Sequence, residues 1–104
     1  MKRLGVQYRP EAQANLESIF IYVLERSGDW QVATRYVDRI YARCERLGET
    51  PLSGTARDDL RKGIRLTGFE RRAAIAFTSD GDGVEIIRIL HGGRDVENLR
   101  DAGQ

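Results

Sequence analysis

The sequence contains few of the residues on which disulfides, metal centres and membrane anchors depend. Its 104 residues include one cysteine, Cys44, and one histidine, His91. A single cysteine cannot close an internal disulfide, and one cysteine with one histidine does not make an ordinary zinc site. No run approaches the roughly 18 apolar residues of a membrane-spanning helix, and the first residues lack the apolar core of a secretory signal. We therefore expect a protein of a reducing compartment that holds no metal and no cofactor.

Lysine is scarce as well. Lys2 and Lys62 are the only two, so 15 of the 17 basic residues are arginines. Because 16 acidic residues leave a formal net charge of only +1, a strongly basic nucleic-acid-binding protein is disfavoured. Arginine is permanently charged and forms bidentate contacts with carboxylates and phosphates. Two explanations of the excess stay open: a GC-rich coding sequence, or surfaces that recognise such anions.

The remaining composition is that of a globular chain, with 40% hydrophobic and 32% charged residues. We expect one domain, residues 1–104, because this length leaves little room for a second. At this size about 60–70% of the unfolded chain's surface can be buried, which is enough for a core without covalent staples.

Apolar periodicity predicts the order strand, helix, helix and then three strands. Asp29 is the expected N-cap of the second helix, and the run Asp80-Gly81-Asp82-Gly83 is the expected hairpin turn before the last strand. Helices grouped ahead of a largely antiparallel sheet indicate an α+β fold, with the helical hairpin packed on one face of a small sheet. The predicted segments are 4–8, 12–24, 33–47, 63–67, 73–77 and 84–90.

Two candidate chemical groups are better explained by structure than by catalysis. Cys44 lies on the apolar stripe of the second helix, where a free cysteine usually behaves as a small buried hydrophobe. Asp80 and Asp82 could hold a cation, but aspartates next to glycine are typical of turns. We therefore expect neither group to be a nucleophile or a metal ligand.

Arginines are concentrated in two regions. Arg35, Arg39, Arg43 and Arg46 follow one face of the second helix, which indicates either a solvated face or a surface for an acidic partner. In the sheet half, residues 60–79 carry a net charge of +4, and Arg88, His91 and Arg94 follow. Arginines on an open sheet face attract phosphate or carboxylate, although they also keep edge strands soluble. With His91 as acid or base, metal-free RNA cleavage by Arg65, Arg72, His91 and Arg94 is chemically conceivable.

An ordered set of short motifs over nearly the whole chain resembles ParE, the toxin branch of the RelE/ParE toxin superfamily. The motifs are Tyr8-Arg9-Pro10-Glu11-Ala12, Leu16-Glu17-Ser18-Ile19 with Tyr22, Gly28, Ala33, Tyr36, Pro51-Leu52-Ser53-Gly54, Leu60-Arg61-Lys62-Gly63-Ile64-Arg65, and Val84-Glu85-Ile86-Ile87-Arg88-Ile89-Leu90-His91-Gly92-Gly93-Arg94-Asp95. The resemblance implies a small cytoplasmic α+β toxin that inhibits bacterial growth. It also implies a ParD-like antitoxin as partner, in a hetero-oligomer, and DNA gyrase as target.

The RelE-like relatives instead cut mRNA on the ribosome. The resemblance to them implies basic residues on the second and third strands, an arginine after the fourth, and a tyrosine near the carboxyl terminus. Arg65, Arg72 and Arg94 stand at plausible positions for the first three, but every tyrosine lies in the first half of the chain. We therefore expect a non-enzymatic gyrase inhibitor. The alternatives are a ribosome-dependent, metal-independent endoribonuclease and an inactive antitoxin-binding module.

These expectations assign two surfaces. The antitoxin is expected on the apolar strip Phe20, Val23, Leu24, Tyr36 and Ile40, since a wrapping peptide uses apolar grooves or sheet edges. An acidic antitoxin segment should also meet the arginine-rich sheet face. The target is expected at the last strand and tail, on Arg88, His91, Arg94 and Arg100. No membrane contact and no sequence-specific DNA binding by this chain alone are expected.

Overall fold

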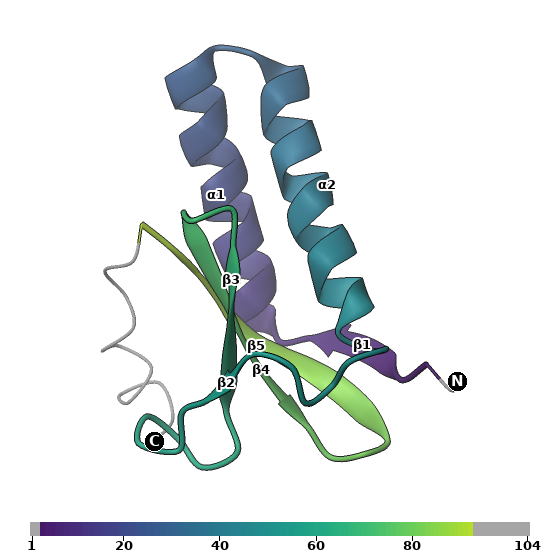
Figure 1. Cartoon of the computed structure of the whole chain (residues 1–104). Helices are drawn as coiled ribbons and strands as arrows, with labels where there is room; N and C mark the ends of the chain where they lie inside the picture. Colours follow the sequence, from purple (N-terminus) through teal and green to yellow (C-terminus); the bar gives the residue numbers. More distant parts are fainter. Residues whose placement is uncertain (1–2, 93–104) are drawn as a thin grey trace.

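The computed structural model describes residues 3–92, and within them the chain forms two helices and five strands (Figure 1). In chain order these are β1 (Gly5–Tyr8), α1 (Pro10–Ser27), α2 (Trp30–Arg46), β2 (Thr55–Ala56), β3 (Arg65–Phe69), β4 (Ala73–Ser79) and β5 (Gly83–His91). The predicted order of elements is confirmed, with β2 as an addition inside the segment expected to be a loop.

The strands form one sheet in the order β1-β5-β4-β3-β2. β1 is parallel to β5, and every other neighbouring pair is antiparallel. A parallel first strand is possible because the two helices carry the chain away from β1 before it returns. The expected α+β class with a largely antiparallel sheet is confirmed.

Local sequence signals account for the ends of the helices. Pro10 occupies the first turn of α1, where its missing N–H costs nothing. Gly28 ends α1 in the left-handed conformation at φ 67°, and its N–H bonds to the carbonyl of Leu24 at 2.8 Å. The predicted cap is confirmed, because Asp29 Oδ1 accepts a hydrogen bond from the N–H of Gln31 at 2.8 Å.

The sheet has apolar side chains on both faces. The larger cluster lies between the helices and the sheet and includes Leu16, Ile40, Phe77 and Ile86, all buried. A smaller cluster covers the opposite, open face of the sheet: Leu60, Ile64, Ala76, Ile87 and Leu90. Loop residues therefore cover part of the open face, where Leu60 and Ile64 pack against strand residues.

A β-bulge in β5 decides which face its later residues occupy. The pairing with β4 shifts between Ala76 and Phe77, so that Ala76 lies opposite Arg88 and Ala73 lies opposite His91. Beside the bulge, the Ile89 N–H donates to Asn15 Oδ1 of α1 at 3.0 Å. This side-chain bond satisfies a strand donor at a position that β1 does not reach.

The helical hairpin extends beyond the sheet (Figure 1). Its exposed large apolar side chains are Ile21, Tyr22, Trp30 and Val32, of which Trp30 is 65% exposed. In the described part of the chain, neither helix is long and apolar enough to cross a membrane. Four of the five exposed large apolar side chains of the described residues therefore lie on the hairpin.

Candidate functional site

A groove of about 630 Å³ lies where the helical hairpin meets the β3–β4 turn and the end of β5. Its lining residues are Tyr22, Val23, Arg26, Ser27, Val32, Arg35, Tyr36, Arg39, Glu70, Arg72 and His91. An adjoining hollow of about 690 Å³ shares four of them, Tyr22, Arg26, Arg72 and His91. We call the first of these hollows the hairpin groove.

His91 stands at the centre of this surface. Its ring meets the rings of Tyr22 and Tyr36 edge-on, with centroids 5.2 Å and 6.0 Å apart. Its Nε2 atom lies 3.4 Å from the hydroxyl oxygen of Tyr36. Burial lowers the pKa of His91, and the nearby positive charge of Arg72 lowers it further. The neutral imidazole is therefore favoured near pH 7.

An ion pair joins the β3–β4 turn to α2. Arg39 Nε and Nη2 donate to the two carboxylate oxygens of Glu70 at 2.8 Å and 3.1 Å. This contact raises the pKa of Arg39 and lowers the pKa of Glu70. The Arg39 guanidinium also lies 5.4 Å from the centre of the Tyr36 ring. The arrangement is bidentate and places Glu70 on the rim of the groove.

The turn that carries Glu70 is strained. Glu70 and Arg71 have φ values of 48° and 63°, and the Arg72 N–H bonds to the Phe69 carbonyl at 3.1 Å. The left-handed conformation costs a residue with a side chain roughly 1–2 kcal/mol. Two successive residues with positive φ form the mirror-image turn that is common between the strands of a hairpin. Here it places Arg72 beside His91.

The hairpin groove is strongly positive. It contains four arginines and one glutamate, a formal net charge of +3, whereas the whole chain carries only +1. Arg26 lies over the Tyr22 ring at 5.2 Å, and Arg39 is neutralised by Glu70. Within residues 3–92, the side chains of Arg35 and Arg72 form no ion pair. Among the described residues, these two guanidinium groups have no carboxylate partner.

The structure divides the predicted antitoxin strip. Val23 and Tyr36 line the hairpin groove. Phe20 lies in a different hollow of about 470 Å³, with Ile21, Val37 and Tyr41, and its ring packs edge-on against Trp30 at 4.9 Å. Leu24 is half-buried and lines neither hollow.

One member of that strip has to be corrected. Ile40 is fully buried in the core between the helices and the sheet. The apolar stripe of α2 turns inward at this position, so the Ile40 side chain offers no surface to a partner.

The residues of the conditional nuclease set do not converge. Arg65 pairs in register with Phe77, four residues along β3 from the end where Phe69, Ala73 and His91 stand opposite one another. At about 3.4 Å per residue this separates the two ends by roughly 14 Å. Arg72 and His91 do meet in the groove. Arg94 lies outside the described residues.

Arg65 is hydrogen-bonded to the loop that precedes β2. Its Nε donates to the Ser53 carbonyl at 2.8 Å, and its Nη2 donates to the carbonyls of Leu52 and Gly54 at 2.7 Å and 3.4 Å. A guanidinium that bonds three carbonyls of one loop is acting as a structural clamp. These three bonds use three of the five N–H donors of the guanidinium and fix the side chain against the loop.

The predicted target residues are also separated. Arg88 shares the open face of the sheet with Ala76, whereas His91 shares the helix face with Ala73. Arg94 and Arg100 lie outside the described residues. Arg88 and His91 therefore lie on opposite faces of the sheet, near the end of β5.

The arginine stripe of α2 is more engaged than a solvated face. Arg39 pairs with Glu70 of the β3–β4 turn, and Arg43 donates to the Thr67 hydroxyl at 2.8 Å. Arg35 lines the hairpin groove. The part of the stripe from Arg35 to Arg43 thus faces the groove and the sheet. The acid that pairs with Arg39 is Glu70, from the turn between β3 and β4.

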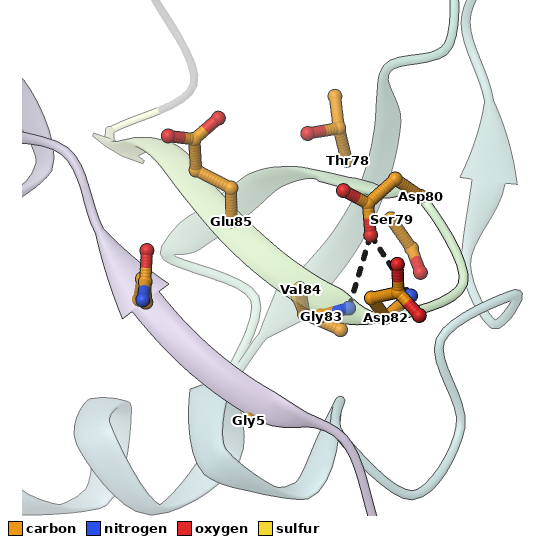
Figure 2. A pocket seen from close by; sticks show the side chains of 9 residues that line it. Gly5, Thr78, Ser79, Asp80, Asp82, Gly83, Val84 and Glu85 are labelled. Atoms are coloured by element: carbon orange, nitrogen blue, oxygen red, sulfur yellow. Dashed lines mark hydrogen bonds between the residues drawn. The ribbon is translucent and has the colours of Figure 1, made fainter.

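The acidic turn before β5 is a structural device. Figure 2 shows the Asp80 carboxylate accepting hydrogen bonds from the N–H groups of Asp82 and Gly83, at 2.9 Å and 3.0 Å. These bonds lower the pKa of Asp80. Among residues 3–92 no cluster of three or more acidic, histidine or cysteine side chains is placed to hold a metal. The hydrogen bonds of its carboxylate explain Asp80 as a turn residue.

Cys44 is confirmed as a core residue. It is fully buried, and burial raises the pKa of its thiol to about 12. The reactive thiolate is therefore essentially absent near pH 7.

The sequence analysis assigned six residues of the hairpin groove to three separate surfaces and missed the other five. The six are Val23, Arg35, Tyr36, Arg39, Arg72 and His91, and the five are Tyr22, Arg26, Ser27, Val32 and Glu70. Val32, Arg35, Tyr36 and Arg39 recur at the spacing of one helix face, and Tyr22 and Arg26 are one turn apart on α1. This helical spacing is a signal from which Tyr22, Arg26 and Val32 could have been predicted as neighbours of Tyr36. What the sequence could not reveal is that the β3–β4 turn brings Arg72 and Glu70 against these helix faces.

Comparison with known proteins gives consistent matches. The family model for the ParE toxin of the type II toxin-antitoxin system parDE matches residues 6–96. Toxin ParE1 of Mycobacterium tuberculosis, in strains CDC 1551 / Oshkosh and ATCC 25618 / H37Rv, is 32% identical over 89 residues, which cover 85% of this chain and 89% of that protein. A solved chromosomal ParDE TA system from P. aeruginosa has the same fold, with a TM-score of 0.74 at 22% identity over 86% of this chain and 96% of that chain.

Proposed function

This chain belongs to the ParE toxin family of type II toxin-antitoxin systems, and from that premise we propose that it inhibits DNA gyrase in the cytoplasm and is neutralised by a ParD-like antitoxin. The family fixes the class of system. The choice of target and the kind of antitoxin are the proposal.

The hydrogen bonds of Arg65 to a loop are the main observation in favour of a toxin that binds its target rather than one that cleaves RNA. A metal-free nuclease needs several cations around the scissile phosphate, together with an acid and a base. Arg65 donates to the carbonyls of Leu52 and Ser53, which holds this cation at the end of β3 that lies away from His91. A groove with aromatic and arginine walls remains, and such a surface is suited to recognising a protein.

A supercoiling assay with the purified chain tests the target. Inhibition of gyrase, with mRNA left intact in a translation extract, is the expected result. Codon-localised mRNA cuts together with fully active gyrase would contradict the proposal. Normal growth of cells that express the soluble chain alone would indicate the inactive antitoxin-binding module instead.

The antitoxin is tested by co-expression with the reading frame immediately upstream. We expect a small protein with a DNA-binding portion and an acidic tail, which restores growth and co-purifies with this chain. A frame that neither rescues growth nor co-purifies would argue against a ParD-like partner.

We assign the gyrase contact to Arg88 and His91, with Arg94 and Arg100 beyond the described part. Arg88 offers the sharper test because it lies on the face of the sheet opposite the hairpin groove. Arg88→Gln is expected to weaken gyrase inhibition more than it weakens antitoxin binding. Arg46→Gln, which removes an exposed arginine of α2 outside the groove, is the matched control.

An endoribonuclease is the second candidate, and one observation favours it. The tyrosine that RelE-like relatives carry near the carboxyl terminus is missing, but Tyr36 and Tyr22 stand against His91, with Arg72 in the same groove. Tyr36→Phe should abolish toxicity if the hydroxyl takes part in cleavage. Full toxicity of Tyr36→Phe would remove this candidate.

A further inference from the structure

We infer that Asn15 of α1 is a positioning residue for the end of β5. Its side chain fixes the β-bulge at Ile87, and the bulge puts His91 on the helix face of the sheet and Arg88 on the open face. This placement stands on hydrogen bonds and strand register alone. Its consequence for toxicity rests on the proposed function, which assigns the gyrase contact to Arg88 and His91.

The bulge consists of one extra residue in β5. Ile86 lies opposite Phe77, and after the bulge Arg88 lies opposite Ala76. Between these two pairs β5 has one residue more than β4, namely Ile87. Because side chains alternate between the two faces of a sheet, one inserted residue reverses the faces of all residues that follow it. The bulge therefore decides where the two described target residues lie.

A regular β5 would exchange the two faces. In unbroken pairing Arg88 would take the place of Ile89 opposite Ile75, and His91 would lie opposite Arg72. Ile75 is fully buried in the core between the helices and the sheet. An arginine would enter that core without a partner, which is costly, and the imidazole would move to the open face. This cost favours a bulge before Arg88 but does not fix its position.

Backbone hydrogen bonds show that Asn15 recognises only the bulged form of the strand. The Ile86 carbonyl accepts the Arg9 N–H at 3.0 Å, so the backbone of Ile86 points away from β4, toward β1. In a regular strand successive residues point to alternate sides, so the backbone of residue 89 would point at β4. Asn15 Oδ1 instead accepts the Ile89 N–H at 3.0 Å, on the side of α1. This bond requires one added residue between Ile86 and Ile89.

The far end of the strand agrees with this reversal. The Gly92 N–H donates to the Arg72 carbonyl at 2.8 Å, so the backbone of Gly92 points at β4. Three residues earlier, the backbone of Ile89 points the other way. β1 ends at Tyr8, so within residues 3–92 no strand offers an acceptor there, and Asn15 supplies it. The side chain of α1 thus selects the register of β5.

The bulge gives His91 its surroundings. On the helix face its ring meets the rings of Tyr22 and Tyr36, at centroid distances of 5.2 Å and 6.0 Å. On the open face it would lose both contacts, and Arg88 would move in the opposite direction. Asn15 lines neither of the hollows that contain His91. It therefore acts through the strand backbone and not by contact with a target.

NMR spectroscopy of the untagged full chain tests the placement. His91 is the only histidine, so its imidazole signals are assigned directly, and their through-space contacts to tyrosine ring protons report the helix face. Asn15→Leu is expected to lose these contacts and to speed exchange of the Ile89 amide hydrogen at least about tenfold. Asn15→Asp keeps an oxygen acceptor and should retain both features. Tyrosine contacts that persist in Asn15→Leu would overturn the inference, whatever the exchange rate.

Gln13→Leu is the matched control. Gln13 is another amide side chain of α1, but it accepts a hydrogen bond from the Tyr41 hydroxyl of α2 at 2.9 Å. Its loss should leave the His91 contacts and the Ile89 exchange unchanged. Equal effects of both leucine variants would mean a general loosening of α1 and would overturn the inference. If thermal melts show that Asn15→Leu does not fold, Asn15→Ser, whose shorter side chain does not reach the strand, replaces it with the same expectations.

Gyrase inhibition by the same variants separates this inference from the proposed function. Inhibition is expected to weaken at least about tenfold in Asn15→Leu and to match that of the native chain in Asn15→Asp. If Asn15→Leu loses the tyrosine contacts yet inhibits fully, the positioning role stands and the gyrase contact does not lie on Arg88 and His91. If the native chain does not inhibit gyrase, the proposed target is wrong, and the NMR result still decides the role of Asn15.

Discussion

At the residue scale, the 15 arginines of this chain perform several different tasks. Arg65 clamps a loop through three carbonyls, Arg39 pairs with Glu70, and Arg43 bonds Thr67. Arg35 and Arg72 stay available in the hairpin groove. An excess of arginine in a sequence therefore does not identify a binding surface, since some guanidinium groups are already used inside the fold.

The loop clamp gives a prediction about stability. Replacing Arg65 by Met removes the donors and leaves carbonyls of Leu52 and Ser53 without their partner, so urea unfolding should show a loss of roughly 1–3 kcal/mol. The exposed Arg46→Met change is the control and should cost under about 0.5 kcal/mol. A loss no larger than that of the control would mean that solvent replaces the clamp.

The lowered pKa of His91 predicts how stability depends on pH. Tyr22 and Tyr36 contact the ring from the two helices, and the positive charges of Arg72 and Arg26 share its groove. Because the folded state binds a proton less readily than the unfolded chain, this residue's contribution is complete above the unfolded pKa of about 6.5 and is lost as pH falls through the lower folded value.

His91→Asn should remove that dependence. The melting temperature of the native chain should fall more steeply between pH 7 and pH 5 than that of the variant, as followed by circular dichroism. His91 is the only histidine of the sequence, so no second imidazole contributes in this range. Parallel profiles for the two proteins would show that the imidazole is not the titrating group.

At the element scale, the β3–β4 turn is the clearest case of strain. Arg71 has a φ of 63°, a conformation that glycine adopts without steric cost. Arg71→Gly should therefore stabilise the chain by about 0.5–1 kcal/mol, after the entropy of the added glycine is subtracted. Chemical denaturation measures the change, and the opposite sign would mean that the Arg71 side chain has an unrecognised partner.

How far the elements could be predicted depended on how local their causes are. Asp29, Gly28 and the apolar stripes act within one helical turn, so both helices were predicted closely. β2 was missed because a two-residue strand has no periodicity of its own and exists only through pairing with Arg65 and Leu66. The burial of Ile40 and the clamp of Arg65 arise from the sheet, which the sequence pattern does not place in space.

At the scale of the whole molecule, the helical hairpin has two unlike surfaces. One is the positive hairpin groove beside the sheet, with Val23 and His91. The other is the outer hollow with Phe20, Ile21 and Val37. If an antitoxin wraps the hairpin, it contacts the first surface through charge and the second through apolar side chains, and variants can separate the two contributions.

The hollow that contains Phe20 is tested with a double variant, Phe20→Ala with Trp30→Ala. The two rings pack on each other at the tip of the hairpin, and Trp30 is 65% exposed, so the core should survive their loss. Ile40→Ala is unsuitable because emptying this buried position costs about 2–5 kcal/mol of stability.

Calorimetric titration of the double variant with the co-purifying antitoxin should show a loss of more than about 1 kcal/mol in binding free energy. Leu52→Ala, an exposed apolar residue of the loop after α2, is the control. If the double variant binds the antitoxin as tightly as the native chain does, the antitoxin does not contact the hollow that contains Phe20.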